Sequence, residues 1–381
     1  MNKKCKTFLF LGLTLLILLI SVSATSATDN NDSSISLHDS NVDNTIIEDS
    51  KIIQTQQKKE VKTESKNKNI KDNKTYKQPK KAVETTQTAT DYETLKQSLN
   101  NIKNEGDNTT DYIINVKNGN YKFTEELEIN TTSNIKSITI NGEDPDKTIF
   151  DGANKTRLFN LNTTTLKINF NNITFTNGFN DTKAGAIYSK SVMNINNSKF
   201  INNTLSNKTE DSYYGSNLYG GAIFTENTCT INNSYFIHNI LANGYSSNGG
   251  AIFINGTNNE TILLTIMNTE FIENGATVNS YAFGGAIASS KNTLFNISKC
   301  YFSDNKAIYY ADIYNDKYDM DHIQNITECV FENTNKRENI VYIRGSYNVS
   351  HNYFVNKGGN RDNIKDDLVF LVNGQPLGKC F

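Results

Sequence analysis

The stretch that decides the fold runs from Gly220 to Asn239 and reads GGAIFTENTCTINNSYFIHN. It begins with the phrase GGAI and ends with FxxN, and both parts recur down the chain in the same order. The phrases are AGAI at 184–187 and GGAI at 220–223, 249–252 and 284–287, answered by Phe200/Asn203, Phe236/Asn239, Phe271/Asn274 and Phe302/Asn305. Because short β-like segments repeating in a fixed order are typical of stacked units, we expect a coil of parallel strands.

Alignment of the repeats on their Phe predicts the cross-section of one coil. The aligned residues are Phe175, Phe200, Phe236, Phe271, Phe302, Phe331 and Phe354. Positions seven and five residues before each Phe are mostly apolar, so we expect them to point inward from one strand. The Phe and the residue two before it should also point inward, which requires a bend between the two pairs. In four repeats an Asn stands at this bend; these are Asn172, Asn197, Asn233 and Asn268. Asn tolerates the left-handed conformation and can hydrogen-bond its stacked neighbour, so we expect a ladder of Asn side chains at this corner.

The Asn of FxxN should form a second ladder at the next corner, and the GGAI phrase should supply the third side with its Ile pointing inward. We therefore predict an all-β fold, a parallel β-helix with three short strands per coil and about eight coils. The spacing from Phe331 to Phe354 is too short for the four-stranded blade of a β-propeller.

The sequence divides into five parts. Residues 1–24 have the basic, apolar and small-residue regions of a signal peptide, with an uncleaved anchor as the alternative. Residues 25–90 are rich in Asn, Lys and Thr and are predicted to be a disordered linker. Residues 91–135 should form an N-terminal cap that contains a short helix, 136–360 the repeats, and 361–381 a C-terminal strand, a cap or the start of a truncated module. Tyr92, Leu95, Leu99 and Ile102 fall at helical spacing, and Gly106 closes that run.

Charge and cysteine content limit the classes of partner. The chain has 38 basic and 40 acidic residues and a formal net charge of -2, so we expect no nucleic-acid partner. The second half of the linker is basic and is either a solvated spacer or a tether to an anionic cell wall. We expect no transmembrane domain after signal cleavage. Cys300 and Cys329 occupy equivalent positions in neighbouring coils and form either a disulfide or part of a ladder of small residues.

The alternating GGAI and FxxN phrases resemble the repeat of the polymorphic outer-membrane protein family of bacterial surface adhesins. They are also similar to the adhesin-like proteins of methanogenic archaea, and SITINGEDPDKTIFDG at 137–152 is most similar to that archaeal group. The resemblance covers about residues 90–360. It implies a right-handed, pectin-lyase-like β-helix, secretion, and an adhesive role outside the cell or on its surface, and it identifies no ligand.

We expect a protein that binds cell-surface or extracellular glycans or proteins and is not an enzyme. Two alternatives stay open: a polysaccharide lyase or glycoside hydrolase, since parallel β-helices also serve these enzymes, and a passive envelope protein. No cofactor or metal site is predicted. The insertions between FxxN and the next GGAI, at 204–219, 240–248 and 275–283, carry aromatic residues among Ser, Asn and Gly, a composition typical of binding loops. The predicted ligand-binding residues are Tyr213, Tyr214, Tyr219, Tyr245 and Tyr281.

Overall fold

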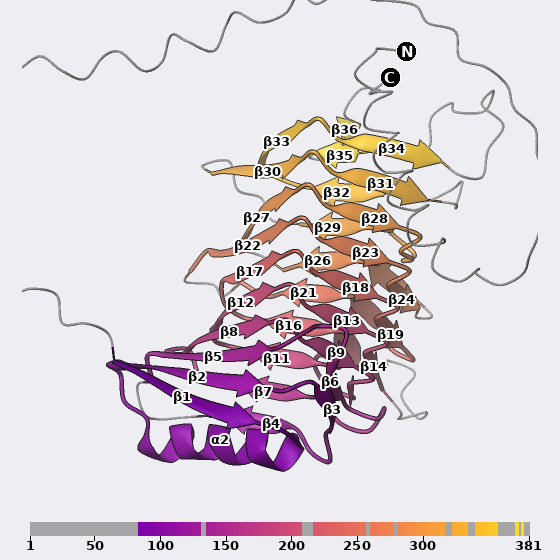
Figure 1. Cartoon of the computed structure of the whole chain (residues 1–381). Coiled ribbons are helices and arrows are strands. Elements are labelled where there is room, and N and C mark those ends of the chain that lie inside the picture. The colour runs from indigo at the N-terminus through magenta and orange to yellow at the C-terminus, as the bar shows by residue number, and fades with distance from the viewer. Residues whose placement is uncertain are drawn as a thin grey trace, which may run out of the picture. The chain divides into compact units, whose positions relative to one another are not determined.

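The structure is a computed structural model that describes residues 83–130, 135–207, 216–256, 260–277, 280–290, 292–316, 322–333, 340–356, 370–372 and 375–376. These residues belong to one compact unit, Lys77–Phe381. The predicted signal segment and residues 25–82 of the predicted linker lie outside the described residues. The described part is mostly β, with one helix, and its strands form long parallel sheets (Figure 1). This architecture is compatible with the predicted parallel β-helix.

Three long sheets, here called A, B and C, contain most of the strands. Sheet A consists of β1 (Val83–Ala89), β2 (Thr110–Val116), β5 (Ser137–Gly142), β8 (Lys167–Asn171), β12 (Val192–Asn196), β17 (Cys229–Asn232), β22 (Ile262–Met267), β27 (Thr293–Ser298), β30 (Ile323–Thr327) and β33 (Ser346–Ser350). Sheet B consists of β3 (Gly119–Lys122), β6 (Thr148–Asp151), β9 (Thr174–Thr176), β13 (Lys199–Ile201), β18 (Tyr235–Ile237), β23 (Glu270–Ile272), β28 (Tyr301–Ser303), β31 (Val330–Asn333) and β34 (Tyr353–Asn356).

Sheet C consists of β4 (Leu127–Ile129), β7 (Phe159–Leu161), β11 (Ile187–Ser189), β16 (Ile223–Thr225), β21 (Ile252–Ile254), β26 (Ile287–Ser289), β29 (Ile313–Asn315), β32 (Val341–Ile343), β35 (Phe370–Val372) and β36 (Gln375–Pro376). From β2 onward the chain passes from sheet A to sheet B and then to sheet C before it returns to sheet A, and we call each such passage a coil. The described strand pairs are parallel except β35 with β36. Equivalent residues of successive coils therefore stack in files. In Figure 1 the coils are stacked in chain order, from indigo to yellow.

The interior of the coils is built from these files. Phe175, Phe200, Phe236, Phe271, Phe302 and Phe331 are fully buried. From Phe175 to Phe354, successive ring centroids are 4.6 to 5.2 Å apart, with interplanar angles of 2° to 14°. The inward positions on sheet A, such as Met193 and Ile195, pair in register with Cys229 and Ile231 of the next coil and are buried with them. The inward directions predicted from the alignment are thus confirmed.

The bend between sheets A and B has the predicted left-handed backbone. Asn172, Asn197, Asn233 and Asn268 have φ of 57°, 46°, 49° and 48°. The next three coils place Lys299, Glu328 and His351 in the same conformation, with φ of 55°, 56° and 58°. Asn197 Nδ2 donates to Asn172 Oδ1 at 2.8 Å, whereas Asn268 Nδ2 donates to Asn232 Oδ1 at 3.0 Å. The side chains at the bend do not form one continuous ladder, because Asn268 bonds to Asn232 and not to its equivalent residue Asn233. The predicted ladder is therefore only partly correct.

The second Asn ladder, at the end of sheet B, is buried and continuous. Asn203, Asn239, Asn274 and Asn305 are each 0% exposed. The side chain of Asn239 accepts from Asn203 N and Asn203 Nδ2 at 3.2 and 2.9 Å, and its own Nδ2 donates to Phe200 O at 2.9 Å. Asn239 and Asn274 donate to the next member in the same way. Each amide thus satisfies buried polar groups of two coils, which explains why this corner requires Asn.

The GGAI phrase forms the corner that leads into sheet C. Its first position has a positive φ, of 70°, 71° and 63° at Gly220, Gly249 and Gly284, and an Ala in the first phrase adopts the same conformation. Its second Gly is needed for space, since a Cβ on Gly250 would lie 2.0 Å from Gly285 O of the next coil. The Ile of each phrase is 0% exposed, as predicted; these residues are Ile187, Ile223, Ile252 and Ile287.

The helix predicted from the spacing of Tyr92, Leu95, Leu99 and Ile102 is present as α2 (Tyr92–Glu105). Those four side chains are buried against β1, β2 and β4, and Figure 1 shows α2 lying across the first strands. Asp91 begins the helix because its side chain accepts from Thr94 N at 2.8 Å while Thr94 Oγ1 accepts from Asp91 N.

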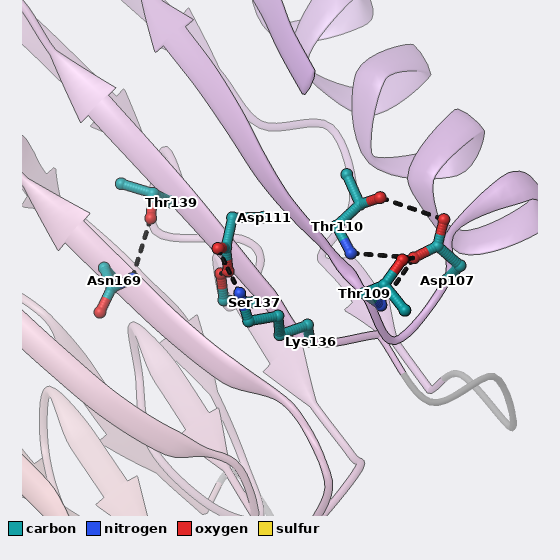
Figure 2. Close-up of polar contacts among 8 residues, drawn as sticks. All are labelled: Asp107, Thr109, Thr110, Asp111, Lys136, Ser137, Thr139 and Asn169. Atoms are coloured by element: carbon teal, nitrogen blue, oxygen red, sulfur yellow. Dashed lines mark hydrogen bonds and ion pairs between the residues drawn. The ribbon is translucent and has the colours of Figure 1, made fainter. Parts of the chain in front are cut away.

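The linker prediction is wrong over its last residues, because Val83–Ala89 form β1 and pair in parallel with β2. Only Ala89 at the end of β1 is fully buried, so the strand contains no alternating apolar signal that a sequence could reveal. In Figure 2, Asp107 accepts from Thr109 N and Thr110 N at 2.7 and 2.8 Å and closes the turn before β2. Asp111 of β2 accepts from Ser137 Oγ of β5 at 2.5 Å.

The insertions predicted as binding loops contain short regular strands and are therefore not loops throughout. Sheet D consists of β10 (Phe179–Asn180), β14 (Thr204–Ser206), β19 (Ile240–Ala242) and β24 (Gly275–Thr277), and sheet E of β15 (Asn217–Tyr219), β20 (Ser246–Asn248) and β25 (Tyr281–Phe283). The two sheets enclose a small core of their own, made by Leu205, Leu218, Leu241, Ala276, Ala282 and Ala307. The insertions therefore stack in register with one another and bury apolar side chains of their own.

Substitution of Asn239 by Ala tests the buried ladder. It removes the acceptor of Asn203 N and Asn203 Nδ2 and the donor to Phe200 O, and each unpaired buried group costs about 1–3 kcal/mol. We expect Asn239→Ala to lower the free energy of unfolding in urea by about 3 kcal/mol or more. The control is Asn196→Ala at the exposed outer end of a sheet A strand, with an expected loss below about 0.5 kcal/mol. Equal losses for both variants would show that the ladder has no special role.

Candidate functional site

The structure places the predicted binding tyrosines in two different surroundings. Tyr213 and Tyr214 lie outside the described residues. Tyr245 and Tyr281 come together, with ring centroids 5.9 Å apart, and Tyr281 is 46% exposed. Tyr219 lies at the opposite end of these short strands, where its ring centroid is 4.6 Å from that of Phe253. Of the described tyrosines among these five, only Tyr219 therefore belongs to the surface described next.

The two residues that flank each GGAI corner approach one another on the outer surface of sheet C. The residue before one phrase packs against the residue after the phrase of the next coil. Lys183 Nζ is 4.5 Å from the ring centroid of Phe224, and the ring centroids of Phe283 and Tyr314 are 4.7 Å apart. The preceding residues are Lys183, Tyr219, Asn248, Phe283 and Tyr309, and the following ones are Tyr188, Phe224, Phe253, Ala288 and Tyr314. These two files form a surface that runs along the coils.

A groove of about 390 Å³ lies on this surface. Its lining comes from four neighbouring coils and consists of Lys183, Tyr219, Phe224, Asn248, Phe253, Asn255, Ser289 and Ser290. Phe224 and Phe253 are 2% and 4% exposed, so these two packed rings form an apolar floor of the groove. The volume and the combination of an aromatic floor with a few polar groups fit a ligand-binding site.

The polar groups of the groove lie where the aromatic lining is interrupted. At this level the flanking residues are Asn248 and Ala288 instead of two large rings. Ser290 Oγ donates to Asn255 Oδ1 at 2.7 Å, which holds these two side chains together. Ser289 stands two residues after the inward Ile287, so its buried hydroxyl points into the coil. The polar side chains of the groove here are those of Asn248, Asn255 and Ser290. A ligand hydroxyl in the groove has polar partners here and apolar contact on the adjoining rings.

The charged residues at one end of the groove neutralise one another. Lys183 Nζ lies 3.0 Å from Glu226 Oε1, and Arg157 forms an ion pair of 2.7 Å with Glu126. Burial raises the pKa of Tyr188 to about 12, and the Glu226 carboxylate adds to this rise. The Tyr188 phenol is therefore neutral at physiological pH, and both cations have carboxylate partners. This arrangement favours an uncharged polar ligand over a strongly charged one.

The sequence contains a signal for this surface that the predictions did not use. The residue after an inward Ile must point outward in a strand, and it is aromatic in AGAIY, in two GGAIF phrases and in ADIY at 311–314. The phrase is predicted only to supply the third side of the coil, and recognition is predicted only in the insertions. The residue before the phrase could be placed beside the outward ring only once the corner geometry was known.

The described residues contain no metal-binding cluster and no membrane-spanning helix. Within the ranges that the structure describes, no group of three or more His, Cys, Asp and Glu side chains is arranged to hold a metal ion. None of the helices in those ranges has the length and apolar composition needed to cross a lipid bilayer. Comparisons of the chain with protein families, curated proteins and solved structures found no match.

Cys300 and Cys329 occupy one file in neighbouring coils, and the structure holds them as free thiols. Their Sγ atoms donate to the carbonyl two residues earlier, at 3.2 and 3.3 Å. Three residues of the same file, Ser198, Ser234 and Thr269, donate in the same way at 2.9, 2.8 and 2.8 Å. The thiols thus continue a ladder of small hydroxyl side chains, one of the two predicted alternatives.

Thiol alkylation distinguishes this ladder from a disulfide. Burial raises the pKa of Cys229 to about 12 and that of Cys300 well above its ordinary value, so these groups stay protonated and unreactive at pH 8. In the full chain with Cys5→Ser and Cys380→Ser, we expect iodoacetamide at pH 8 to modify none of the three remaining cysteines in the folded protein. After unfolding without reductant, all three should react, as read by intact mass. Reaction of one cysteine alone, with the other two released by reductant, would establish a disulfide instead.

Proposed function

We propose that this protein is a secreted, surface-associated, adhesin-like protein that binds a cell-surface or extracellular glycan or protein and catalyses no reaction. In this proposal its fold is a right-handed parallel β-helix of about eight coils, with α2 closing the N-terminal end. The composition of residues 1–24 supports export, and the basic linker supports an association with an anionic cell wall.

The observation that carries the proposal is the groove over sheet C. Its volume is about 390 Å³, its floor is aromatic, and its polar side chains are amides and hydroxyls together with the Lys183 ammonium group, which is paired with Glu226. The nearby carboxylates Glu126 and Glu226 are paired with Arg157 and Lys183. Both carboxylates are held by cations, whereas glycoside hydrolysis requires two carboxyl groups that flank the scissile bond. The groove is thus better suited to binding than to glycoside hydrolysis.

Binding of the full chain to a glycan array and to a panel of extracellular matrix proteins tests this function. For the tightest ligand on the array or panel, we expect Asn248→Ala combined with Asn255→Ala to weaken binding about tenfold, since two hydrogen bonds are removed. The matched control is Asn194→Ala on the outer face of sheet A, which should bind like the original protein.

Two results would overturn the proposal. Cleavage of any member of a polysaccharide panel by the purified protein would establish an enzyme. Absence of binding to every glycan and protein tested would favour a passive envelope protein.

A further inference from the structure

A second aromatic cluster continues the surface beyond the groove. Its members, which we call the tyrosine platform, are Phe283, Tyr309, Tyr310, Tyr314 and Tyr342. Tyr310 lies between two neighbours, with ring centroids 4.7 Å from Tyr342 and 5.5 Å from Tyr314. The Phe283 ring connects Tyr309 and Tyr314, at 5.1 and 4.7 Å. The rings therefore form one continuous apolar surface and are not scattered individually.

The platform is maintained against a backbone preference. Tyr310 has a φ of 59° and stands at the first position of the degenerate phrase YADI, where the preceding coils have Ala184, Gly220, Gly249 and Gly284. A bulky residue in the left-handed region is disfavoured relative to Gly. Gly would suit this backbone, yet the chain has Tyr310 here, and its ring joins those of Tyr314 and Tyr342.

The platform is open to solvent and carries no net charge. Tyr309 and the adjoining Ile308 are 43% and 45% exposed, and the other rings are half-buried. Burial raises the pKa of Tyr310 and of Tyr314, so both phenols are neutral hydrogen-bonding groups at physiological pH. The neighbouring Arg344 is paired with Asp316 at 2.8 Å.

The platform and the groove lie on the same file of sheet C. Phe253, Ala288 and Tyr314 are paired residues of β21, β26 and β29 and point outward together. Neighbouring strands are about 4.8 Å apart, so Phe253 and Tyr314 are separated by roughly 10 Å along the coils. Ala288 lies between these two rings and has a small side chain, so the surface is lower there. The groove residues Asn248, Ser289 and Ser290 border this position.

We propose that the tyrosine platform is a second binding subsite for a linear, uncharged glycan that also occupies the groove and runs along the coils. This inference rests on the proposed function and names its ligand class. A pyranose ring presents a face of C–H groups that suits the negative face of an aromatic ring, while its hydroxyls suit amide and hydroxyl side chains. The surface has aromatic rings at both ends and polar side chains between them, which suits a chain of pyranose rings.

The test uses the full chain and neutral β-linked hexose and N-acetylhexosamine oligosaccharides of two to eight units, with affinities measured by calorimetry. We expect the affinity to rise with length until the oligosaccharide spans both subsites. Tyr310→Gly should weaken binding of the longest oligosaccharide about tenfold and leave binding of the disaccharide unchanged. Because Gly suits a φ of 59°, Tyr310→Gly should unfold at the same or a higher urea concentration, which excludes misfolding as the cause.

Tyr353→Ala is the control, since Tyr353 is 46% exposed on the outer face of sheet B, away from this surface. It should bind every oligosaccharide like the original protein. Affinities that stop rising at the disaccharide, or an unchanged affinity of Tyr310→Gly for the longest oligosaccharide, would overturn the second subsite and leave the proposed function intact. Binding to a matrix protein without binding to any oligosaccharide would overturn the glycan assignment. Absence of binding to all of these probes would overturn both proposals.

Discussion

The structure depends on the close approach of successive backbones at the GGAI corner. A Cβ on the second Gly of three successive phrases would lie 2.0 to 2.3 Å from a carbonyl oxygen of the next coil. Only a residue without a side chain fits there. This approach lets the strands on both sides of the corner keep the spacing of a parallel sheet, and it brings equivalent residues of neighbouring coils into direct contact.

Everything else in the interior follows from that repeated spacing. Phe rings stack face to face, and the buried Asn amides bond to their own copies in the next coil, because each position meets an equivalent residue. On the outer surface the same spacing aligns the flanks of the corners, so Tyr219 reaches Phe253 and Phe283 reaches Tyr314. The corner is therefore structural itself and also positions the candidate binding surface beside it.

Repetition explains which features the sequence could predict. The inward Phe file, the left-handed Asn bend, the buried Asn203 ladder and the helix with Leu95 were all predictable, because each has a periodic residue pattern. Strand β1 was missed because it carries almost no buried apolar residues. The strands of sheets D and E were missed because their few buried positions are a mixture of Leu, Ala and Ser without a periodic pattern. The groove was missed because it joins residues from different coils, and Tyr310 departs from the Gly that the pattern favours.

Urea unfolding of Gly250→Ala is the most direct measurement of the backbone approach. The added Cβ would lie 2.0 Å from Gly285 O, which belongs to the backbone and cannot rotate away. We expect a loss of at least about 2 kcal/mol in the free energy of unfolding. The matched change is Gly119→Ala in β3, where the nearest atom to the new Cβ is 3.5 Å away and the expected change is within about 1 kcal/mol. An unchanged unfolding midpoint for Gly250→Ala would contradict the close approach on which the fold depends.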